Sequence, residues 1–493
     1  MTPGALLLDV GRPRCKSFAM RRLRLLCASA LLVSSTGCGG DAVAPTHGRP
    51  NNMVFITLPP PQILQGEDVS PAIVVEVRDS AGNVVTGSSL NVTLSFDTNP
   101  GSATLHGAAT VGTNRGQAMF TDVSVDQRGH GYRLKASAPT LPPIVSTAFD
   151  VIAPLPVTKL AAGSEHTCAI TTDGAAYCWG LDGATEDTLD VANPIPTQVE
   201  TAVRFDTLTA GYFTTCGVTA AGAAYCWGSN FSARLGDSTQ TDRPTPVPIQ
   251  GAHVWTGQIS VGFFHSCGLE RSGAAYCWGY GNVGQLGDSV VPPHVSLALV
   301  PVAGGYTFKV VHSVNFHTCG LTTTYRVYCW GSNNQGALGD STLTEKYAPT
   351  PVYGGGTFLT IVAGFSHSCA IGVDSYTYCW GANTVGQLGD GTTTMRLMPT
   401  RVIAAPALVS LTAHGQFTCG LTALGATWCW GQSYGSSPKA IVQPEPFTAI
   451  AAGFGHICGV TLTHRAYCWG VNTNGQLGDG TKTSRSAPTL VVY

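Results

Sequence analysis

Charged side chains are scarce in this chain, whose 493 residues include only 26 Lys and Arg and 28 Asp and Glu, or 11%. With a formal net charge of −2, no basic field is available to hold a phosphate backbone, so we expect no nucleic-acid partner. Long helices usually carry many Lys and Glu, and the scarcity of both beside 60 Gly and 30 Pro favours short strands joined by turns. The length exceeds one simple core, so two or more domains are expected.

The apolar run near the N-terminus, residues 23–33, is too short for a stable membrane span. Arg21, Arg22 and Arg24 lie at its start, and small residues lead from its end into Cys38, a layout typical of a secretory signal. It resembles a bacterial lipoprotein signal, in which the cysteine after the cleavage site receives the lipid, although Ser35 stands where Leu is usual. The resemblance implies a signal peptide over residues 20–38 with lipidation at Cys38.

Residues 1–19 fit no part of such a signal. We expect them to be an extension of the gene model upstream of a start at Met20, the alternative being a long positively charged leader. Residues 39–50 are rich in Gly and Pro and read as a linker. Together with the cysteine pattern below, the leader predicts a location at the bacterial cell envelope or outside the cell.

Cysteine is absent from residues 51–152, where short alternating runs such as AIVVEVRD and GYRLKAS recur about every ten residues. Period-two strands separated by turn residues predict an all-β sandwich. The order PAIVVEVRDSAGNVVTG, GQAMFTDVSV, GYRLKASA resembles bacterial immunoglobulin-like domains, which implies a spacer or an adhesion module.

From residue 157 onward one unit recurs seven times: a cysteine, nine residues, then Cys-Trp-Gly. A turn lies midway between the two cysteines, so an antiparallel hairpin places them opposite each other at a distance that a disulfide can bridge. Each such loop adds about 3 kcal/mol on the chain-entropy model. The predicted disulfides are Cys168–Cys178, Cys216–Cys226, Cys267–Cys277, Cys319–Cys329, Cys369–Cys379, Cys419–Cys429 and Cys458–Cys468. With Cys15, Cys27 and Cys38 they account for all 17 cysteines, which is typical of an exported protein.

A second shared element follows most Cys-Trp-Gly motifs, as in Asn282–Asp288, Asn333–Asp340, Asn383–Gly391 and Asn472–Gly480, with a variant over Asn230–Asp237. Its glycines suit turns with positive φ, and its single Leu should fill the core. The combination of G-x-x-H-x-C, Y-C-W-G, N-x-x-G-Q-L-G-D-G and P-x-V resembles the regulator of chromosome condensation repeat. The resemblance implies an all-β, seven-bladed propeller of four-stranded blades after the immunoglobulin-like sandwich.

The expected repeats span about residues 157–204, 205–255, 256–307, 308–357, 358–407, 408–446 and 447–493. Two depart from the pattern. Blade one has Leu181–Asp187 in place of the Gly-Gln-Leu-Gly loop, and blade six is shortened after Trp430, so we expect altered surface at both.

Two patterns suggest chemistry, and for both we favour a structural interpretation. His-x-Cys occurs at His166, His265, His317, His367 and His456, but tetrahedral zinc needs four ligands at one point and these lie on separate blades. We expect them to make repeat-structural hydrogen bonds, with no metal and no cofactor. Gly431–Gly435 matches G-x-S-x-G but lacks the following helix of a nucleophile elbow, so no catalytic residue is predicted.

Aromatic residues recur in the turn that precedes the first cysteine of each pair, and aromatic rings supply much of the energy of protein interfaces. We expect them either to bind a partner or to pack between blades, and the adjacent pairs Tyr212/Phe213 and Phe263/Phe264 are the best binding candidates. Tyr434 in blade six is another exposed candidate. The set is Tyr212, Phe213, Phe263, Phe264, Phe316, Phe365, Phe417 and Phe454, with Tyr434.

The sequence predicts a non-enzymatic, monomeric binding protein that holds a protein or glycan through one propeller face and touches the membrane only through a lipid anchor. The alternatives are a purely structural spacer or adhesin, and an enzyme with a site at the central channel. The family resemblance adds guanine-nucleotide exchange, and a secreted bacterial propeller of this repeat type is a β-lactamase inhibitor. For neither activity can the residues that contact the partner be matched to positions of this chain.

Overall fold

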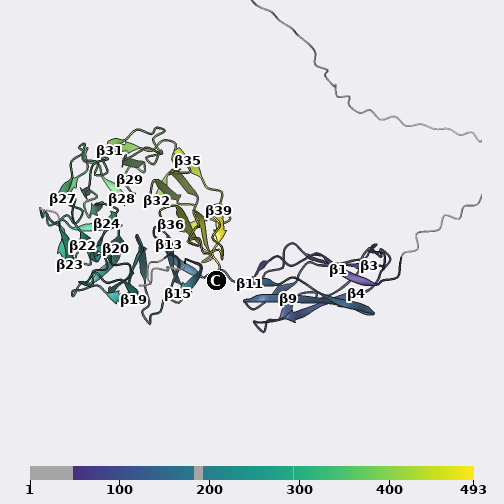
Figure 1. Ribbon diagram of the computed structural model, residues 1–493. Helices are drawn as coiled ribbons and strands as arrows, with labels where there is room; N and C mark the ends of the chain where they lie inside the picture. The colour runs from purple at the N-terminus through teal and green to yellow at the C-terminus, as the bar shows by residue number, and fades with distance from the viewer. Residues whose placement is uncertain (1–47, 182–191, 292–293) are drawn as a thin grey trace, which may run out of the picture.

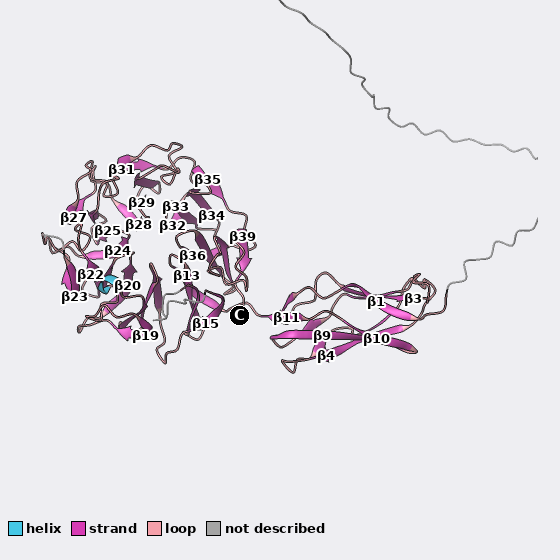
Figure 2. Ribbon diagram, viewed as in Figure 1, coloured by secondary structure: helices cyan, strands magenta, loops and turns pink. Residues whose placement is uncertain are grey.

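The computed structural model describes residues 48–181, 192–291 and 294–493 as an almost purely β protein with one short 3-10 helix, η1 (Phe231–Ala233). Figure 1 shows two bodies, a ring of blades and a smaller elongated domain at its N-terminal side. The secondary structure in Figure 2 is strand throughout both bodies, apart from that helix. The predicted signal peptide, Cys38, most of the linker and most of the blade-one segment 181–187 lie outside the described residues.

The N-terminal domain consists of two main sheets around one core. One sheet has the order β1-β3-β7, the other β2-β11-β9-β4-β6 with β10 beside β9, and β5 pairs with β8. In β9, Tyr132, Leu134 and Ala136 alternate inward and are buried, which is the period-two pattern of the sequence. The strands are β1 (Asn52–Thr57), β2 (Gln62–Leu64), β3 (Ile73–Arg78), β4 (Asn91–Thr98), β5 (Leu105–His106), β6 (Thr110–Gly112), β7 (Gln117–Phe120), β8 (Ser124–Val125), β9 (Gly129–Ala138), β10 (Leu141–Val145) and β11 (Phe149–Ile152).

The rest of the chain forms seven four-stranded antiparallel sheets, each built from four consecutive strands and called blades 1 to 7 in chain order. This is the seven-bladed propeller that the repeats predict. The first strand of each blade lies innermost: β12 (Val157–Ala162), β16 (Thr207–Ala210), β20 (Trp255–Val261), β24 (Phe308–Val314), β28 (Phe358–Ala363), β32 (Leu408–His414) and β36 (Phe447–Ala452).

The second and third strands of each blade carry the cysteines. The second strands are β13 (His166–Thr171), β17 (Thr214–Val218), β21 (His265–Glu270), β25 (His317–Thr322), β29 (His367–Gly372), β33 (Phe417–Thr422) and β37 (His456–Thr461). The third strands are β14 (Ala176–Gly180), β18 (Ala224–Gly228), β22 (Ala275–Tyr280), β26 (Val327–Gly331), β30 (Thr377–Gly381), β34 (Thr427–Gly431) and β38 (Ala466–Gly470).

The fourth strands form the rim of the ring. They are β15 (Asn193–Gln198), β19 (Arg243–Pro248), β23 (Val295–Pro301), β27 (Lys346–Pro351), β31 (Arg396–Arg401), β35 (Gly435–Ala440) and β39 (Arg485–Leu490). Because neighbouring strands are antiparallel, the connections from first to second and from third to fourth strand share one face, here called the loop face. The turns from second to third strand and the links to the next blade lie on the opposite face, here called the hairpin face.

Each cysteine pair is joined by a disulfide between directly opposed residues, with Cα atoms 4.0–4.1 Å apart. The register pairs Cys168 with Cys178, and the same pairing recurs in all seven blades. The tryptophan after each second cysteine is at most 2% exposed and fills the space between blades. The short hairpin turn between the second and third strands therefore places both the disulfide and the large apolar side chain of every blade.

The ring is closed without a strand shared between its ends, because blade 7 is built entirely from the C-terminal strands β36 to β39. Pro154 instead forms an isolated antiparallel bridge with Val492, and the amide of Leu155 donates to the carbonyl of Val491. Leu155, Trp179 and Leu477 then share one hydrophobic cluster. Packing and short backbone contacts join the first blade to the last.

Four of the five described loops that carry this leucine are held by an asparagine five positions before it. In blade 4, Asn333 donates to Asp340 at 3.0 Å and accepts from the amide of Leu338 at 3.0 Å. The sequence analysis treated Asn282 as the equivalent of Asn333, and this is wrong. The residue five positions before Leu286 is Gly281, and Asn282 follows it. The motif N-x-x-G is ambiguous by one position where two asparagines or a Gly-Asn pair precede it.

Candidate functional site on the loop face

The centre of the loop face is built by the short turn between the first and second strand of each blade. In blade 5 the amide of Gly364 donates to the carbonyl of His367 at 2.8 Å, which closes the turn. A Cβ at Gly364 would lie 2.0 Å from the His367 ring, so only glycine fits. The two residues between them, Phe365 and Ser366, are thereby fixed at the surface of the loop face.

Side chains from all seven blades meet around one small hollow at the centre of the ring. Six blades contribute the first of these two positions, whereas blade 6 has Gly415 there and contributes His414, which stands at the position of the turn glycine. Its lining is Ser164, Tyr212, Phe263, Val314, Asn315, Phe365, His414 and Phe454. These residues are about 50 positions apart in sequence and meet only because the blades are arranged in a ring.

The aromatic rings on blades 2 to 4 form a continuous row. Tyr212 stacks on Phe263 with ring centroids 3.7 Å apart, and Phe264 stacks on Phe316 at 4.8 Å. Phe263 and Phe264 connect the two stacks at 4.5 Å. We call this row, with Phe213 beside Tyr212 at 4.2 Å, the aromatic row. Its rings are half-buried. The same side chains therefore pack inside the propeller and leave part of their surface exposed to a partner.

Phe365 and Phe454 extend the aromatic surface on the other side of the hollow. Their ring centroids lie 5.9 Å apart in an edge-to-face arrangement, and His414 lies 6.2 Å from Phe454. Phe454 is 45% exposed. Phe417 does not belong to this surface, because it occupies the histidine position of blade 6 and is 3% exposed. The prediction that Phe417 is one of the turn aromatics is therefore wrong, because it lies two residues after Gly415, the first turn position of blade 6.

Arg234 supports the aromatic row from below and was missed by the sequence analysis. It is 2% exposed, donates through Nε to the carbonyl of Ser229 at 3.0 Å, and donates through Nη1 to the carbonyl of Phe263. Its guanidinium also lies 5.9 Å from the Tyr212 ring centroid. Burial lowers the pKa of Arg234 to about 10, so it stays charged at neutral pH. The sequence does contain a signal for this residue: Arg234 stands directly before the loop leucine, where blades 3, 5 and 7 have Gln.

Phe213 has a positive φ of 53°. For a bulky side chain this backbone conformation is a genuine outlier, and it is tolerated only where the surroundings enforce it. The tilted contact between the Phe213 and Tyr212 rings accounts for part of that enforcement. Strain of this kind is concentrated at functional sites, which favours the turn of blade 2 as part of one.

The His-x-Cys histidines do not face the surface. Each ring contacts a hydroxyl of the following blade: His166 with Thr215, His265 with Thr318, His317 with Ser368, His367 with Thr418, and His456 with Thr167, at 2.7–3.1 Å. Burial lowers the pKa of His166 and His317 to about 4, and of His265, His367 and His456 to about 3. These histidines are therefore neutral at physiological pH and hold blades together.

Tyr434 is not the exposed residue that the sequence suggests. It is half-buried, and its hydroxyl accepts a hydrogen bond from Trp469 Nε1 at 3.2 Å. Burial raises the pKa of Tyr434, so the hydroxyl stays protonated. Its place is the junction of blades 6 and 7, away from the aromatic row.

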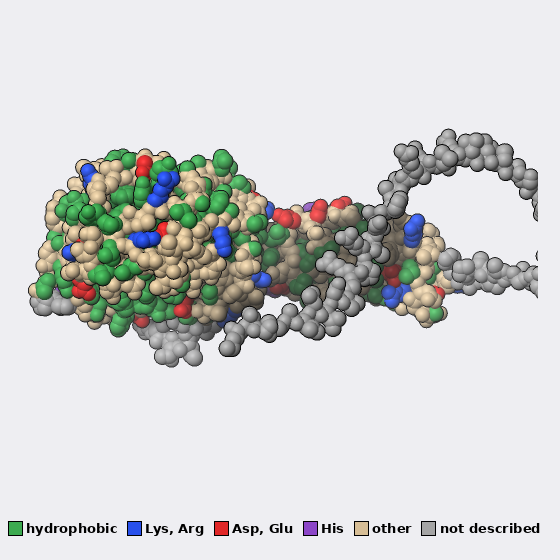
Figure 3. Space-filling model, turned by 90° about the horizontal axis from the view of Figure 1, so that it is seen from above, with side chains coloured by type: hydrophobic (Ala, Val, Ile, Leu, Met, Phe, Trp, Pro, Cys, Tyr) green, Lys and Arg blue, Asp and Glu red, His purple; other side chains and the backbone are tan. Residues whose placement is uncertain are grey.

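Charge contributes little to the surface. The side of the propeller seen in Figure 3 shows scattered Lys, Arg, Asp and Glu among apolar and neutral polar side chains. Across residues 48–181, 192–291 and 294–493, no group of three or more His, Cys, Asp or Glu is placed to hold a metal ion. In the same ranges no helix has the length and hydropathy needed to cross a membrane. The residues that line the central hollow of the loop face include no Lys, Arg, Asp or Glu, so this surface is suited to recognition by contact, since long-range electrostatic steering needs a field of one sign.

Comparison with known protein families matches the blades to the regulator of chromosome condensation (RCC1) repeat. Two models of this repeat match all or part of blades 1 to 7, with matched segments at residues 157–184, 205–233, 258–285, 312–337, 326–371, 374–421, 447–476 and 463–493. The propeller is built from RCC1 repeats. In every blade except blade 6, both cysteines and the Cys-Trp-Gly motif lie within these segments; in blade 6, Cys429, Trp430 and Gly431 lie outside them.

Curated relatives match part of the ring only. The ultraviolet-B receptor UVR8 of Arabidopsis thaliana is 28% identical over 219 residues, which cover 41% of this chain and 48% of the relative. The probable E3 ubiquitin-protein ligase HERC4 of Homo sapiens is 30% identical over 93 residues, 19% of this chain and 9% of the relative. The chain thus spans less than half the length of these relatives, so the likeness is one of RCC1 repeats.

Solved structures agree on the fold. Human WBSCR16 has a TM-score of 0.57 at 19% identity, covering 65% of this chain and 95% of that one. Prp20p of Saccharomyces cerevisiae, described with its binding to Gsp1p and histones, has a TM-score of 0.57 at 20% identity, covering 64% and 85%. At these identities the comparison shows an RCC1-type propeller, and the partners of those proteins are their own.

Proposed function

We propose that this protein is an exported, non-catalytic scaffold of the bacterial cell envelope that binds a partner protein through the loop face of its propeller. The aromatic row and the Phe365–Phe454 pair form the contact surface. The N-terminal two-sheet domain is an immunoglobulin-like spacer, and a lipid on Cys38 is the only attachment to the membrane. The mature protein acts as a monomer without cofactor.

The observation that carries this proposal is the convergence of half-buried aromatic side chains from several blades on one face. Rings already fixed by stacking lose little conformational freedom on binding, which is the property of interface hot spots. The seven buried disulfides support an oxidising location, since reducing compartments keep such thiols free.

A protein partner fits this surface better than a glycan. The reason is the row of stacked rings beside the central hollow, because aromatic side chains are the residues enriched at the cores of protein interfaces. Nucleotide exchange on a GTPase and inhibition of a secreted enzyme are both protein-binding activities of this kind, known by family analogy alone. A structural spacer remains the second candidate, supported by the rigid ring and its disulfides.

The test is cross-linked capture from envelope extract with the full mature protein, compared with Phe263→Ala/Phe264→Ala. The control is Tyr353→Ala, which removes a ring that is 56% exposed on the hairpin face. Binding through the loop face predicts a specific partner lost in the double variant and kept in the control, with all three proteins folded by circular dichroism. A partner kept by the double variant contradicts the proposal, and no specific partner for any of the three supports the spacer.

A further inference from the structure

The junctions between consecutive blades share one design, in which a loop of one blade covers the tryptophan of the next. In five junctions the leucine of this loop is completely buried: Leu235, Leu286, Leu338, Leu388 and Leu477. In four of them the carbonyl just before the leucine accepts a hydrogen bond of 2.8–3.0 Å from the indole Nε1 of Trp278, Trp330, Trp380 or Trp179. A leucine in a glycine turn is therefore the normal occupant of a blade junction.

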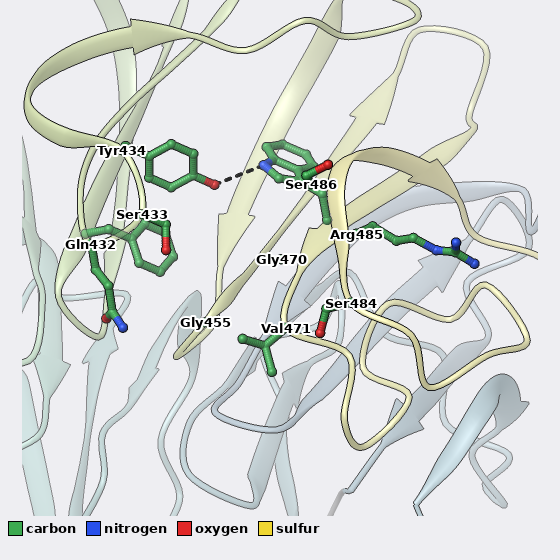
Figure 4. Close-up of a pocket in the computed structure, with 11 residues that line it drawn as sticks. Gln432, Ser433, Tyr434, Gly455, Gly470, Val471, Ser484, Arg485 and Ser486 are labelled. Carbon is green, nitrogen blue, oxygen red and sulfur yellow. Dashed lines mark hydrogen bonds between the residues drawn. The ribbon is translucent and has the colours of Figure 1, made fainter.

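The junction of blades 6 and 7 lacks this occupant. Blade 6 passes from β34 to β35 through Gln432, Ser433 and Tyr434 alone. The place of the loop is a hollow of about 500 Å³ on the loop face, which Figure 4 shows between Tyr434 and Val471. This volume is within the range of ordinary ligand sites.

Gly470 shows that the hollow is the site of the missing loop. The equivalent glycines Gly180, Gly331, Gly381 and Gly431 each lie against the loop of the preceding blade, whose Cα is 3.1–3.3 Å from the position of a Cβ. For Gly470 the three nearest atoms belong to blade 7 itself, in Gly455 and His456. The glycine backbone is kept and the loop it accommodates is absent.

The surrounding residues are adapted to the missing loop. Phe417 replaces the junction histidine, and Ile457 replaces the hydroxyl residue of the next blade. In other junctions that hydroxyl donates to the loop carbonyl, and neither Phe417 nor Ile457 requires such an acceptor. Tyr434 supplies its hydroxyl oxygen to Trp469 Nε1 in place of that carbonyl. The junction is thus stable when the hollow is empty, and its floor of Phe417 and Trp469 is almost fully buried.

We propose that this hollow binds a glycine turn bearing a leucine, presented by a partner protein in place of the missing loop. The Tyr434 hydroxyl, which accepts from Trp469, still has its own proton to donate to a carbonyl of the turn. Val471, which is 42% exposed, lies beside Gly470 as the apolar wall for the leucine side chain.

The rim of the hollow selects for an uncharged turn. Gln432, Ser433 and Ser486 are exposed and neutral. Arg485 is the one charged lining residue, and its guanidinium is paired with Asp479 at 2.8 Å and points away from the hollow in Figure 4. No free charge is therefore available to hold an acidic or basic segment.

The experiment titrates the full mature protein by calorimetry with a cyclic peptide of sequence Val-Gly-Gln-Leu-Gly-Asn-Gly. This is the loop that occupies the junction of blades 5 and 6, with its Asp replaced by Asn so that the turn is uncharged. We expect saturable binding that weakens at least tenfold when the peptide leucine is changed to Asp. Val471→Trp, which fills the hollow at an exposed position, should weaken it at least tenfold as well. Val373→Trp, at a likewise exposed position on the hairpin face, is the control and should leave the affinity unchanged.

Tyr434→Phe keeps the ring and removes the donor, so we expect binding weaker by about fivefold. No binding at millimolar peptide, or equal binding by Val471→Trp, overturns the proposal. The inference is independent of the aromatic row, so Phe263→Ala/Phe264→Ala should bind the peptide normally. Loss of partner capture with normal peptide binding in that variant separates the two sites.

Discussion

His456 in the last blade and Thr167 in the first share a hydrogen bond of 2.8 Å across 289 positions of the chain. The Thr167 hydroxyl donates its proton to the carbonyl of Gln476 at 2.8 Å, so its oxygen must accept from His456 Nε2–H. This assigns the tautomer and leaves Nδ1 of His456 unprotonated, with no hydrogen-bond partner among the described residues. The same chain from histidine to hydroxyl to loop carbonyl recurs at His265, His317 and His367. Burial of the rings keeps these histidines neutral.

These histidines predict that the propeller loses stability in mild acid. Their folded-state pKa values of about 3 to 4 lie below the usual 6.5, so the unfolded chain binds more protons between these limits. Their contribution is complete above pH 6.5 and falls by about 1.4 kcal/mol per histidine and pH unit as the pH drops towards 4. Urea unfolding followed by tryptophan fluorescence between pH 7.5 and 4 measures this slope.

Blade 6 supplies the variant that isolates this effect. Its Phe417 and Ile457 replace a histidine and a hydroxyl together, so the pair His317 and Ser368 should accept the same double change. We expect His317→Phe/Ser368→Ile to fold as the parent does at pH 7.5 and to retain roughly 2–3 kcal/mol more stability at pH 4. His317→Phe alone is the control, since it leaves the Ser368 oxygen without its donor. A double variant as sensitive to acid as the parent contradicts the assignment.

The features that the sequence predicted and those it missed differ in the distance over which their contacts form. Cysteines ten residues apart on a hairpin have a local geometry, so the pairing of Cys319 with Cys329 follows from spacing alone. The stack of Tyr212 on Phe263 joins turns 51 positions apart and depends on how blades are rotated against each other, which spacing does not contain. Tyr434 was misjudged for the same reason, because its partner Trp469 belongs to the next blade.

Removal of one disulfide should lower the free energy of unfolding by a moderate amount. For a closed loop of about ten residues, Cys319→Ala/Cys329→Ala is expected to lower the free energy of unfolding by about 2–3 kcal/mol. Both sulfurs are inaccessible, since the two residues are 0% exposed. Native protein should therefore show no thiol from the propeller in a thiol-reagent assay and resist mild reductant, while unfolding in reductant releases the thiols. Several reactive thiols in the native, non-reduced protein would contradict the seven pairs.

Arg234 should position the aromatic row through its hydrogen bonds to Ser229 and Phe263. Arg234→Ala removes the charged donor of both carbonyls, of which that of Ser229 keeps the Thr214 hydroxyl, so we expect a loss of about 2–4 kcal/mol in the free energy of unfolding. The equivalent residue of blade 4 is Ala337, so an alanine does not by itself disrupt such a loop. Gln387→Ala in blade 5 is therefore the matched control, and it should cost less than about 1.5 kcal/mol because its side chain holds one amide.

The positioning role of Arg234 has a second readout that stability alone does not move. At a temperature where Arg234→Ala remains folded, loss of its bond to Phe263 should loosen the row and weaken partner capture, while the cyclic peptide still binds at the junction of blades 6 and 7. Arg234→Lys should fail to rescue capture, because an ammonium cannot reach the two carbonyls in the fixed geometry of the guanidinium. Full capture by Arg234→Ala would show that the row keeps its shape without this support.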